Sequence, residues 1–358
     1  MSSFQLKIHV VGAGLIGTSI ALASKISDHV VTIEDIEPET ESLARDLLNS
    51  SGERPSSPDV IFVAVSPKKV SEIVLQQLRL HPEAVVVDVA SVKTKVVMDV
   101  ESFPEFAGRF VASHPIAGRE VSGPASAQAD LFRGRAWIIT PGPSVGEESL
   151  STIETLLKSF GAEVLRLSPE RHDFLFARIS HLPQLLSTLL AGSLVDIGTD
   201  AQLSGQGLRD LTRLAGSSGD LWKEIISLNS AEILSALDDY RRQLEEFSSA
   251  ISNGDVERIL DFFQSGNQGR SIFSGKHGGV PRDYTVFHIV IEDKPGVLAE
   301  LFALCGKYHV NVEDLSIEHS PNQETGLISL SISKEQTATL QGALGSSGWN
   351  FHLQGETK

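Results

Sequence analysis

The glycine spacing Gly12-Ala13-Gly14-Leu15-Ile16-Gly17 constrains the fold of this chain more than any other feature of its sequence. A short apolar run at residues 7–11 precedes it, and a helical pattern follows it through residue 26. Glycines at these three positions permit a tight turn and let the helix N-terminus approach a pyrophosphate. The N-terminus of a helix favours the negative charge of that group. The stretch therefore predicts a Rossmann-type α/β domain that binds a dinucleotide. A glycine-rich turn in an α/β protein without a nucleotide is the alternative interpretation.

Polar residues at the ends of later strands supply further predicted cofactor contacts. These later strands are predicted at 29–33, 59–65, 84–89 and 163–167. Asp35 follows the first of them, where an acid binds the ribose hydroxyls and repels a 2′-phosphate, so NAD is favoured over NADP. Ser66 and Ser91 follow the next two, at the edge of the sheet where ligands bind. Ser91 is predicted to contact cofactor and substrate. The alternative is that it caps the helix that begins near Lys93, and both roles can hold together.

A histidine stands at the end of an apolar run in the stretch 111–141. His114 precedes a proline, and a loop of small residues containing Arg119 and Glu120 leads to a second apolar run that predicts a strand. A His-Pro step at a strand end holds an imidazole at the mouth of the sheet, where open α/β sheets bind ligands. On these residues alone, His114 is either a catalytic group or a strand-end histidine packed by its proline.

The bulk composition excludes several classes of protein. A chain of 358 residues predicts two or three domains, and 41% hydrophobic with 21% charged residues is typical of a globular protein in water. The net charge of −16 argues against nucleic-acid binding, and an anionic substrate would need locally placed arginines. The single cysteine excludes a disulfide framework and a multi-cysteine metal site, so no metal is predicted. Without a signal-like tract or a membrane-length apolar run, we expect a cytoplasmic protein with no membrane partner.

The pattern becomes helical after the strand at 163–167. We predict a first domain at 1–168 and an all-α domain at 169–265 for substrate binding and dimerisation. Its helices are expected near 170–195, 205–216, 219–230, 231–252 and 254–265. Polar groups stand out from apolar surroundings there: His172-Asp173, Ser180-His181-Leu182-Pro183-Gln184 and Arg209-Asp210-Leu211-Thr212-Arg213. The two arginines share one helix face. They predict either an anion site or structural ion pairs with Asp210, Asp173 or Glu120.

The last part of the chain predicts a separate small domain. Residues 266–283 are rich in Gly, Ser and basic residues, which indicates a linker. Residues 284–358 follow the order β-α-β-β-α-β of a ferredoxin-like unit. Its first loop, Glu292-Asp293-Lys294-Pro295-Gly296-Val297-Leu298, resembles the DKPGVL loop of ACT domains, which bind amino acids and regulate biosynthetic enzymes. The predicted regulatory residues are Asp293, Gly296, Val297 and Asn311, the last of which opens the second strand.

The first 265 residues resemble the prephenate dehydrogenase family, which also includes arogenate dehydrogenases. The matching motifs are VVGAGLIGTSIA, DVASVK, SHPIAGREVSG, LFRGRAWIITP, HDFLFARISHLP and GLRDLTRLAGSSGDLWKEIISLN. The resemblance implies NAD-dependent oxidative decarboxylation of prephenate to 4-hydroxyphenylpyruvate in L-tyrosine biosynthesis. It also implies a homodimer, and the ACT-like tail suggests tyrosine as an effector, whose sign the sequence leaves open.

Roles follow from the resemblance for residues that match the family motifs. His114 matches the catalytic histidine, and Ser91 matches a serine that orients the substrate hydroxyl and the nicotinamide. Arg213 matches the arginine that binds the ring carboxylate, with Arg209 where a second cation is found. Glu120 and Asp210 match an acidic pair in an ionic network at the site entrance. His181 belongs to the HLP motif and is expected to bind substrate.

Two departures from the family pattern concern the choice of substrate. Arg119 stands where the family usually has Ser or Thr, and Gln184 stands where it often has a second histidine. Both positions are expected near the pyruvyl or alanyl side chain of the substrate. The extra cation favours prephenate, whereas the missing histidine argues against it, so arogenate remains an alternative. Two further alternatives are a dehydrogenase of an amino-substituted prephenate and a catalytically silent amino-acid sensor.

Overall fold

The computed structural model describes residues 5–49, 57–117, 123–272, 284–292, 294–319 and 325–353. The chain divides into two compact units, Met1–Leu244 and Glu245–Lys358. The first unit holds the nucleotide-binding part and most of the helical part, and the second holds the end of the helical part and the C-terminal module. None of the described helices combines the length and apolar character that crossing a membrane would require.

The nucleotide-binding part is a sheet of seven described strands in the order β2-β1-β3-β4-β5-β6-β7. The strands are β1 (Lys7–Val11), β2 (Val30–Glu34), β3 (Val60–Val63), β4 (Val85–Asp88), β5 (Phe110–Pro115), β6 (Ala136–Ile139) and β7 (Glu163–Arg166). All neighbours are parallel except β5 and β6, which are antiparallel. The strands β1, β3, β4 and β5 therefore end at one edge of the sheet. Strand order reverses between β1 and β3, which is where such folds bind nucleotides.

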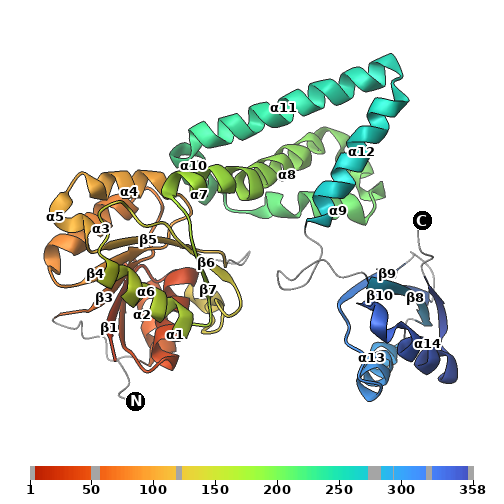
Figure 1. Cartoon of the computed structure of the whole chain (residues 1–358), viewed down its shortest axis with the longest axis horizontal. Helices are drawn as coiled ribbons and strands as arrows, with labels where there is room; N and C mark the ends of the chain where they lie inside the picture. The colour runs from red at the N-terminus through yellow and green to blue at the C-terminus, as the bar shows by residue number, and fades with distance from the viewer. Residues whose placement is uncertain are drawn as a thin grey trace. The chain divides into compact units, whose positions relative to one another are not determined.

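Helices cover both faces of this sheet (Figure 1). They are α1 (Leu15–Ile26), α2 (Pro38–Leu48), α3 (Val70–Leu80), α4 (Thr94–Glu101), α5 (Pro104–Ala107) and α6 (Glu147–Ser159). Strands such as Val60–Val63 are buried along their whole length because both of their faces lie under helices. The Rossmann-type α/β domain predicted from the glycine spacing is confirmed.

The helical part follows β7. Its helices are α7 (Pro169–Phe176), α8 (Leu182–Ser193), α9 (Gln206–Thr212), α10 (Gly219–Leu228), α11 (Ser230–Asn253) and α12 (Val256–Ser271), with 3₁₀ turns at Val195–Leu203 and Arg213–Gly216. The predicted helix at 170–195 corresponds to a continuous helical run from Pro169 to Ser193, in which a π-helical turn, Ala177–His181, joins α7 to α8. Pro183 lacks an N–H and its ring disfavours an ordinary turn before it, and a wider turn relieves both problems.

The predicted linker at 266–283 needs correction at its start. Helix α12 runs to Ser271, so residues 266–271 are helical, and residues 273–283 lie outside the described part of the chain. Asp255 caps the helix by accepting a hydrogen bond from the Arg258 N–H. Once a helix is started, extending it is inexpensive, so Gly266 and Gly269 do not end it.

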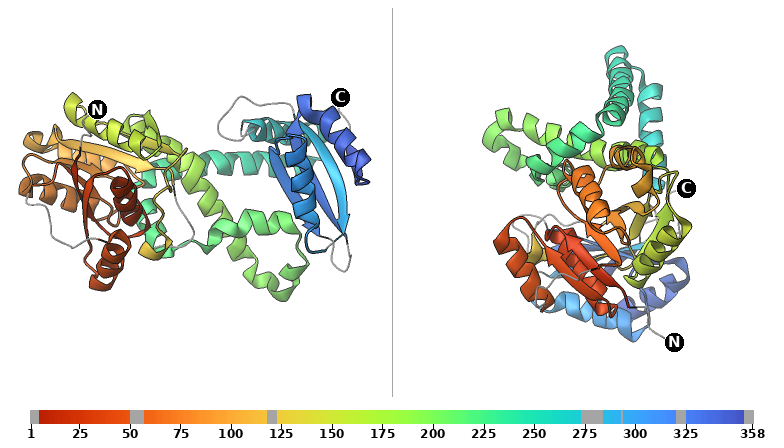
Figure 2. Two further views of the ribbon diagram at one scale, coloured as in Figure 1. Left: turned by 90° about the horizontal axis from the view of Figure 1, so that it is seen from below. Right: turned by 90° about the vertical axis from the view of Figure 1, so that its left-hand side faces the viewer.

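The C-terminal module has the predicted strand and helix order. It comprises β8 (Tyr284–Glu292), α13 (Val297–Lys307), β9 (Asp314–His319), β10 (Thr325–Ser333), α14 (Thr337–Ser346) and β11 (Asn350–Leu353). The antiparallel sheet has the order β11-β8-β10-β9, and its strands run side by side in Figure 2. Alternate residues of β8 and β10, such as Phe287 and Leu330, pack against Leu301 of α13 and Leu344 of α14. Both helices therefore cover the same face of the sheet.

The predicted regulatory residues are only partly placed. Gly296 precedes α13 with φ +99°, a backbone conformation that glycine adopts readily, and Val297 is the first residue of that helix. Asn311 does not open a strand, because its N–H donates to the Gln336 side chain and β9 begins only at Asp314. Asp293 lies outside the described residues.

Candidate active site

The glycine loop between β1 and α1 has the geometry of a dinucleotide site. A Cβ on Gly12, whose φ is +101°, would lie 2.3 Å from the Ala64 carbonyl oxygen, and one on Gly17 would lie 1.9 Å from the Gly12 carbonyl oxygen. These two glycines are required for close packing. A Cβ on Gly14 would meet no described atom within 4 Å, so the start of α1 at Leu15 and Ile16 is open to a ligand. The loop fits a pyrophosphate at a helix N-terminus.

Asp35 lies beside this loop, directly after β2. Its Oδ2 accepts a hydrogen bond from the Ala13 N–H at 2.6 Å, and its Oδ1 accepts one from the Glu37 N–H at 2.9 Å. The carboxylate is thus fixed next to the glycine turn, as ribose binding requires. Its preference for NAD over NADP stays a prediction.

Ser66 follows β3, but its hydroxyl is engaged by the helical part. It donates a hydrogen bond of 2.7 Å to Oε2 of Glu224 in α10, which also accepts from the Lys68 N–H at 3.2 Å. Sequence reasoning missed Glu224, because 158 positions separate it from Ser66 and only the tertiary structure brings them together. The predicted cofactor contact of Ser66 remains a prediction.

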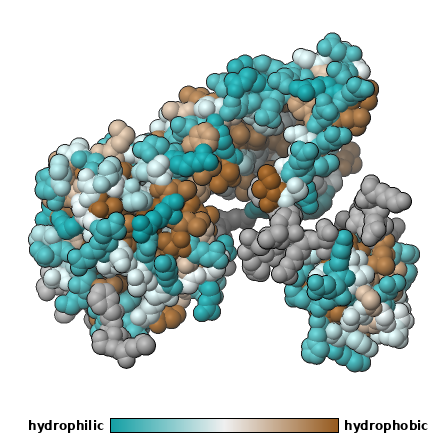
Figure 3. Space-filling view, viewed as in Figure 1, coloured by the Kyte–Doolittle hydropathy of each residue, from teal (hydrophilic) through white to brown (hydrophobic). Residues whose placement is uncertain are grey.

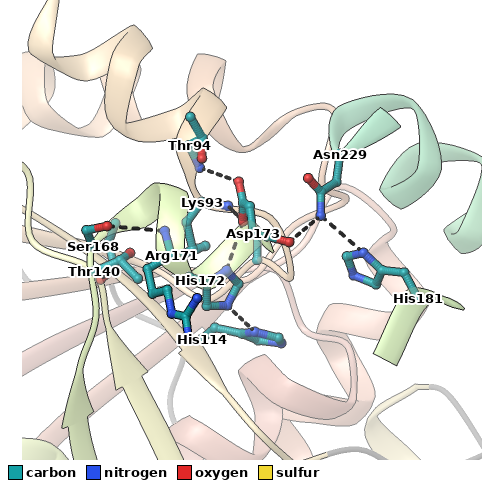
Figure 4. A network of polar contacts seen from close by, with 12 residues as sticks. Lys93, Thr94, His114, Thr140, Ser168, Arg171, His172, Asp173, His181 and Asn229 are labelled. Atoms are coloured by element: carbon teal, nitrogen blue, oxygen red, sulfur yellow. Dashed lines mark hydrogen bonds and ion pairs between the residues drawn. The ribbon is translucent and has the colours of Figure 1, made fainter. Parts of the chain in front are cut away.

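His114, near the end of β5, belongs to a chain of three side chains (Figure 4). Its Nδ1 lies 2.9 Å from Nε2 of His172, and Nδ1 of His172 lies 2.8 Å from Oδ1 of Asp173. The His172 ring stacks on Phe176 at a centroid distance of 4.3 Å. In the sequence, His172 and Asp173 stand out only as polar residues in apolar surroundings, with Asp173 as one alternative ion-pair partner of the arginines, and neither is predicted to contact His114. The strand end and helix α7 therefore share one polar network.

Asp173 also joins the helical part to the nucleotide-binding part. Its two oxygens accept hydrogen bonds from the N–H groups of Lys93 at 2.9 Å and Thr94 at 2.8 Å, at the start of α4. The prediction that Ser91 caps this helix is therefore wrong. The reason is that α4 begins at Thr94, where a carboxylate from another element satisfies the free N–H groups. Ser91 itself lies partly buried between β4 and α4.

A buried ion pair holds the strand that carries His114. The Lys93 ammonium contacts Asp88 Oδ2 and donates to the Ser113 carbonyl oxygen at 2.6 Å, and both charged side chains are 0% exposed. The Ser113 hydroxyl donates to the Asp88 carbonyl oxygen at 2.7 Å and accepts from the Trp137 indole N–H at 3.0 Å. These contacts tie the ends of β4, β5 and β6 together just before His114.

His181 lies to the right of Asp173 in Figure 4, and His114 lies below Asp173. The Asn229 amide donates to the Asp173 carbonyl oxygen at 3.0 Å and lies 3.2 Å from His181 Nδ1. The His181 ring packs edge to face against Trp222, with 5.9 Å between the ring centroids. His181 is 1% exposed, so its predicted contact with substrate stays a prediction.

The predicted substrate-binding arginines lie on a separate segment. Arg209 is in α9 and Arg213 begins the following 3₁₀ turn, and both are exposed. Gln184 of α8 fixes this turn, because its amide donates to the Leu214 carbonyl oxygen at 2.7 Å. Asp210 accepts from the Gln206 amide at 2.8 Å. The predicted roles of Arg209, Arg213, Gln184 and Asp210 stay predictions. Arg119 and Glu120 lie outside the described residues.

Burial and neighbouring charges keep the site histidines neutral. Burial lowers the pKa of His114 well below its ordinary value, and His172, Lys93 and His181 lower it further. Burial also lowers the pKa of His172, although Asp173 opposes that shift. For Asp173 itself, burial raises the pKa, but hydrogen bonds from His172, Thr94 and Lys93 outweigh burial and leave the pKa below its ordinary value. Near pH 7 the network thus holds an ionised Asp173 and two neutral imidazoles. Among the described residues, no group of three His, Cys, Asp or Glu side chains is arranged to hold a metal ion.

The burial of His181 predicts a loss of stability in acid. Burial lowers the pKa of His181 to about 4, whereas an unfolded chain binds this proton near pH 6.5. Between these values the unfolded state holds the extra proton, so the free energy of unfolding falls as the pH falls. We expect His181→Asn, which keeps an acceptor for Asn229, to reduce the loss between pH 7 and pH 5 by about 2 kcal/mol. Urea unfolding of both proteins at both pH values measures this, and parallel losses would contradict it.

Comparisons with known proteins agree with this geometry. Residues 19–166 match the family model described as prephenate dehydrogenase, nucleotide-binding domain, and residues 168–265 match prephenate dehydrogenase, dimerization domain. Prephenate dehydrogenase of Bacillus subtilis is 27% identical over 354 residues, which cover 94% of each chain.

Two solved structures are also similar. Prephenate dehydrogenase from A. aeolicus, in complex with hydroxyphenyl propionate and NAD+, has a TM-score of 0.69 and 28% identity over 75% of this chain and 99% of its own. Synechocystis arogenate dehydrogenase has a TM-score of 0.66 and 28% identity over 74% of this chain and 99% of its own. With its NAD-binding loop and buried histidine network, the chain belongs to the prephenate dehydrogenase family and is an NAD-dependent oxidoreductase.

Proposed function

We propose that the chain catalyses oxidative decarboxylation of prephenate to 4-hydroxyphenylpyruvate with NAD, a step of L-tyrosine biosynthesis. The observation that carries the proposal is His114, a neutral imidazole at the same sheet edge as the glycine loop and bonded through Nδ1 to His172. A neutral imidazole at this edge accepts a proton near pH 7.

The chemistry requires one proton acceptor from the protein. The glycine loop and Asp35 would hold NAD, which would supply the hydride acceptor for the ring carbon that carries the hydroxyl. His114 takes the hydroxyl proton as that carbon becomes a carbonyl. The bond between the ring and its carboxylate then breaks, carbon dioxide leaves, and the electron pair of that bond makes the ring aromatic. The former carbonyl oxygen regains the proton from His114 and becomes the phenol hydroxyl of the product. Ser91, in the loop after β4, orients the hydroxyl toward His114.

Arg213 is proposed to bind the ring carboxylate, and Arg209 supplies a second cation. Arg213→Ala should raise the Michaelis constant for prephenate by roughly 30-fold or more, because a hydrogen bond to a charged group is worth about 2 kcal/mol. The turnover number should change less, since a group that leaves as neutral gas is not held more tightly in the transition state. Steady-state kinetics measures both constants. Arg166→Ala, on the edge strand β7 where Arg166 pairs with Glu154, is the matched control. A defect in turnover alone would contradict the role of Arg213.

Prephenate is preferred to arogenate in this proposal. Supporting it are the similarity to the B. subtilis prephenate dehydrogenase across nearly the whole chain and the cation Arg119, which suits a keto-acid carboxylate. The similar Synechocystis arogenate dehydrogenase keeps the alternative open. The engaged amide of Gln184 positions the turn of Arg213, so we assign it an indirect role in substrate binding.

Initial rates with a panel of substrates test the proposal. Prephenate, arogenate and an amino-substituted prephenate are each offered with NAD and with NADP, and formation of the reduced cofactor is followed. We expect the highest kcat/KM with prephenate and NAD. A higher value with arogenate would replace the substrate assignment, and no product from any acid with folded protein would overturn the function. Equal rates with both cofactors would contradict the role of Asp35.

The C-terminal module is proposed to be an ACT domain that binds an amino acid, with tyrosine as the effector. The resemblance of its first loop and its βαββαβ order support this. Tyrosine added to the rate assay should change kcat/KM for prephenate. Isothermal titration showing no heat with tyrosine, phenylalanine or tryptophan would contradict it.

A homodimer formed through the helical part is also proposed. The matched family model is described as a dimerization domain, and brown apolar patches interrupt the teal surface of the helices in Figure 3. The exposed apolar side chains of the helical part include Ile179, Leu189, Val195, Leu203, Leu211 and Leu234. Burying such a surface favours association. Sedimentation equilibrium at micromolar concentration should give twice the mass of the chain, and a monomer mass would exclude the dimer.

A further inference from the structure

We propose that His172 and Asp173 are positioning residues that hold His114 in the tautomer with a proton on Nδ1 and a free lone pair on Nε2. This inference rests on the proposed role of His114 as the proton acceptor. It adds a requirement that the family resemblance did not supply, because a neutral histidine has two tautomers and only one leaves Nε2 able to accept the hydroxyl proton.

The hydrogen bonds fix the protons one by one. An ionised carboxylate only accepts, so Asp173 Oδ1, at 2.8 Å, requires the proton of His172 to sit on Nδ1. Neutral His172 then has a lone pair on Nε2. Nδ1 of His114 lies 2.9 Å away and must donate to it. The single proton of neutral His114 is thereby placed on Nδ1, and Nε2 becomes the acceptor.

Backbone hydrogen bonds hold Asp173 as an ionised acceptor, so it cannot donate a proton to His172. The N–H groups of Lys93 and Thr94 point at its two oxygens, and they belong to the N-terminus of α4, which favours an anion. His172 is held as well, since its ring is 0% exposed and lies nearly parallel to Phe176, with 16° between the planes. The chain of bonds therefore starts from a fixed charge and ends at the ring of His114.

Charged neighbours among the described residues disfavour a proton on His114, and burial and Lys93 oppose the effect of Asp173, which favours one on His172. Lys93 from the start of α4 contacts Asp88 of β4, and His181 lies in the π-helical turn. Lys93 and His181 both disfavour a proton on His114, while Asp173 is the acid bonded to His172. A protonated His172 would instead donate from both nitrogens and force His114 into the other tautomer. A neutral His172 is thus required for a productive His114.

Two substitutions separate positioning from packing. His172→Phe keeps a ring that stacks on Phe176 but removes the acceptor for His114. His172→Gln keeps a polar group at the place of Nε2, with an amide oxygen that accepts from His114 Nδ1. In steady-state assays we expect kcat to fall roughly 100-fold or more in His172→Phe, because general-base catalysis by His114 is lost. In His172→Gln we expect kcat to recover to within about 10-fold of the wild-type value. His288→Phe, in the C-terminal module, is the matched control and should leave kcat unchanged.

The tautomer itself is read without any assay of activity. The protein is labelled with ¹⁵N in its histidines alone, so that protonated and unprotonated ring nitrogens give distinct chemical shifts. The signals that disappear in His114→Asn are those of His114. Wild type should show His114 protonated on Nδ1, and His172→Phe should show the Nε2-protonated form or a mixture. An unchanged tautomer together with wild-type kcat in His172→Phe would overturn the inference. If wild type forms no NADH from any acid, the proposed function fails instead, and the ¹⁵N spectra still decide the tautomer.

Discussion

Replacing His114 by asparagine should lower the turnover number by roughly two to four orders of magnitude, the range for a lost general base. Asparagine places an amide N–H where Nδ1–H of His114 stood, so the bond of 2.9 Å to His172 can be kept. The variant should therefore retain its fold and lose only the lone pair of Nε2. Substrate affinity should change little, because the arginines predicted to bind the carboxylate lie on another segment.

Kinetics and folding together measure this prediction. Initial rates give kcat and KM for prephenate, and thermal unfolding confirms that the variant is folded. In wild type, kcat/KM should remain constant on lowering the pH from 7 and decline only below pH 6.5, since burial keeps the pKa of His114 well below that value. Turnover near the wild-type value in His114→Asn would mean that this histidine is only a packed residue near a strand end.

Lys93→Met should destabilise the nucleotide-binding part by about 3–5 kcal/mol, the usual loss when one partner of a buried ion pair is removed. Methionine is an unbranched apolar side chain one atom shorter than lysine, and it leaves Asp88 without its cation and the Ser113 carbonyl oxygen without its donor. Burial alone raises the pKa of Asp88, so this carboxyl is expected to take up a proton in the variant, which limits the loss. The predicted range already includes that compensation.

A double-mutant cycle tests whether the two residues act as a pair. Asp88→Asn removes the charge and keeps one oxygen acceptor, whereas the two oxygens of Asp88 accept separately from the N–H groups of Ala90 and Ser113. Urea unfolding followed by tryptophan fluorescence reports on this region, because buried Trp137 bonds to Ser113. The double variant should be more stable than the sum of the two single losses implies. Additive losses would show that the charges do not depend on each other. Lys93→Met should also raise the pKa of His114 and move the acid decline of activity to higher pH.

Much of the fold could be predicted because its signals are local. The glycine spacing dictates strand, turn and helix within about twenty residues, and the structure gives β1 and α1 there. The order of elements in the C-terminal module is likewise visible in its alternating strands. The errors arose where the local signal was weak. The predicted linker begins too early because helix α12 continues through two glycines, and the local pattern does not reveal the π-helical turn within the helical run before Pro183.

For the site, the sequence determined which groups are available, and the tertiary structure decided how they are used. The glycine loop and Asp35 are predicted from their own neighbours in the chain, and the same neighbours place His114 at the edge of the sheet where ligand-binding residues gather. The catalytic role of His114 follows only from the family resemblance. Asp173 lies 80 positions from Lys93, and Glu224 lies 158 positions from Ser66. No periodicity links residues that far apart. Only packing the helical part on the ends of β3 and β4 turns two ordinary carboxylates into acceptors for backbone N–H groups. Folding therefore sets the protonation and orientation of His114, because a bond of 2.9 Å and the exclusion of water depend on elements that meet in three dimensions.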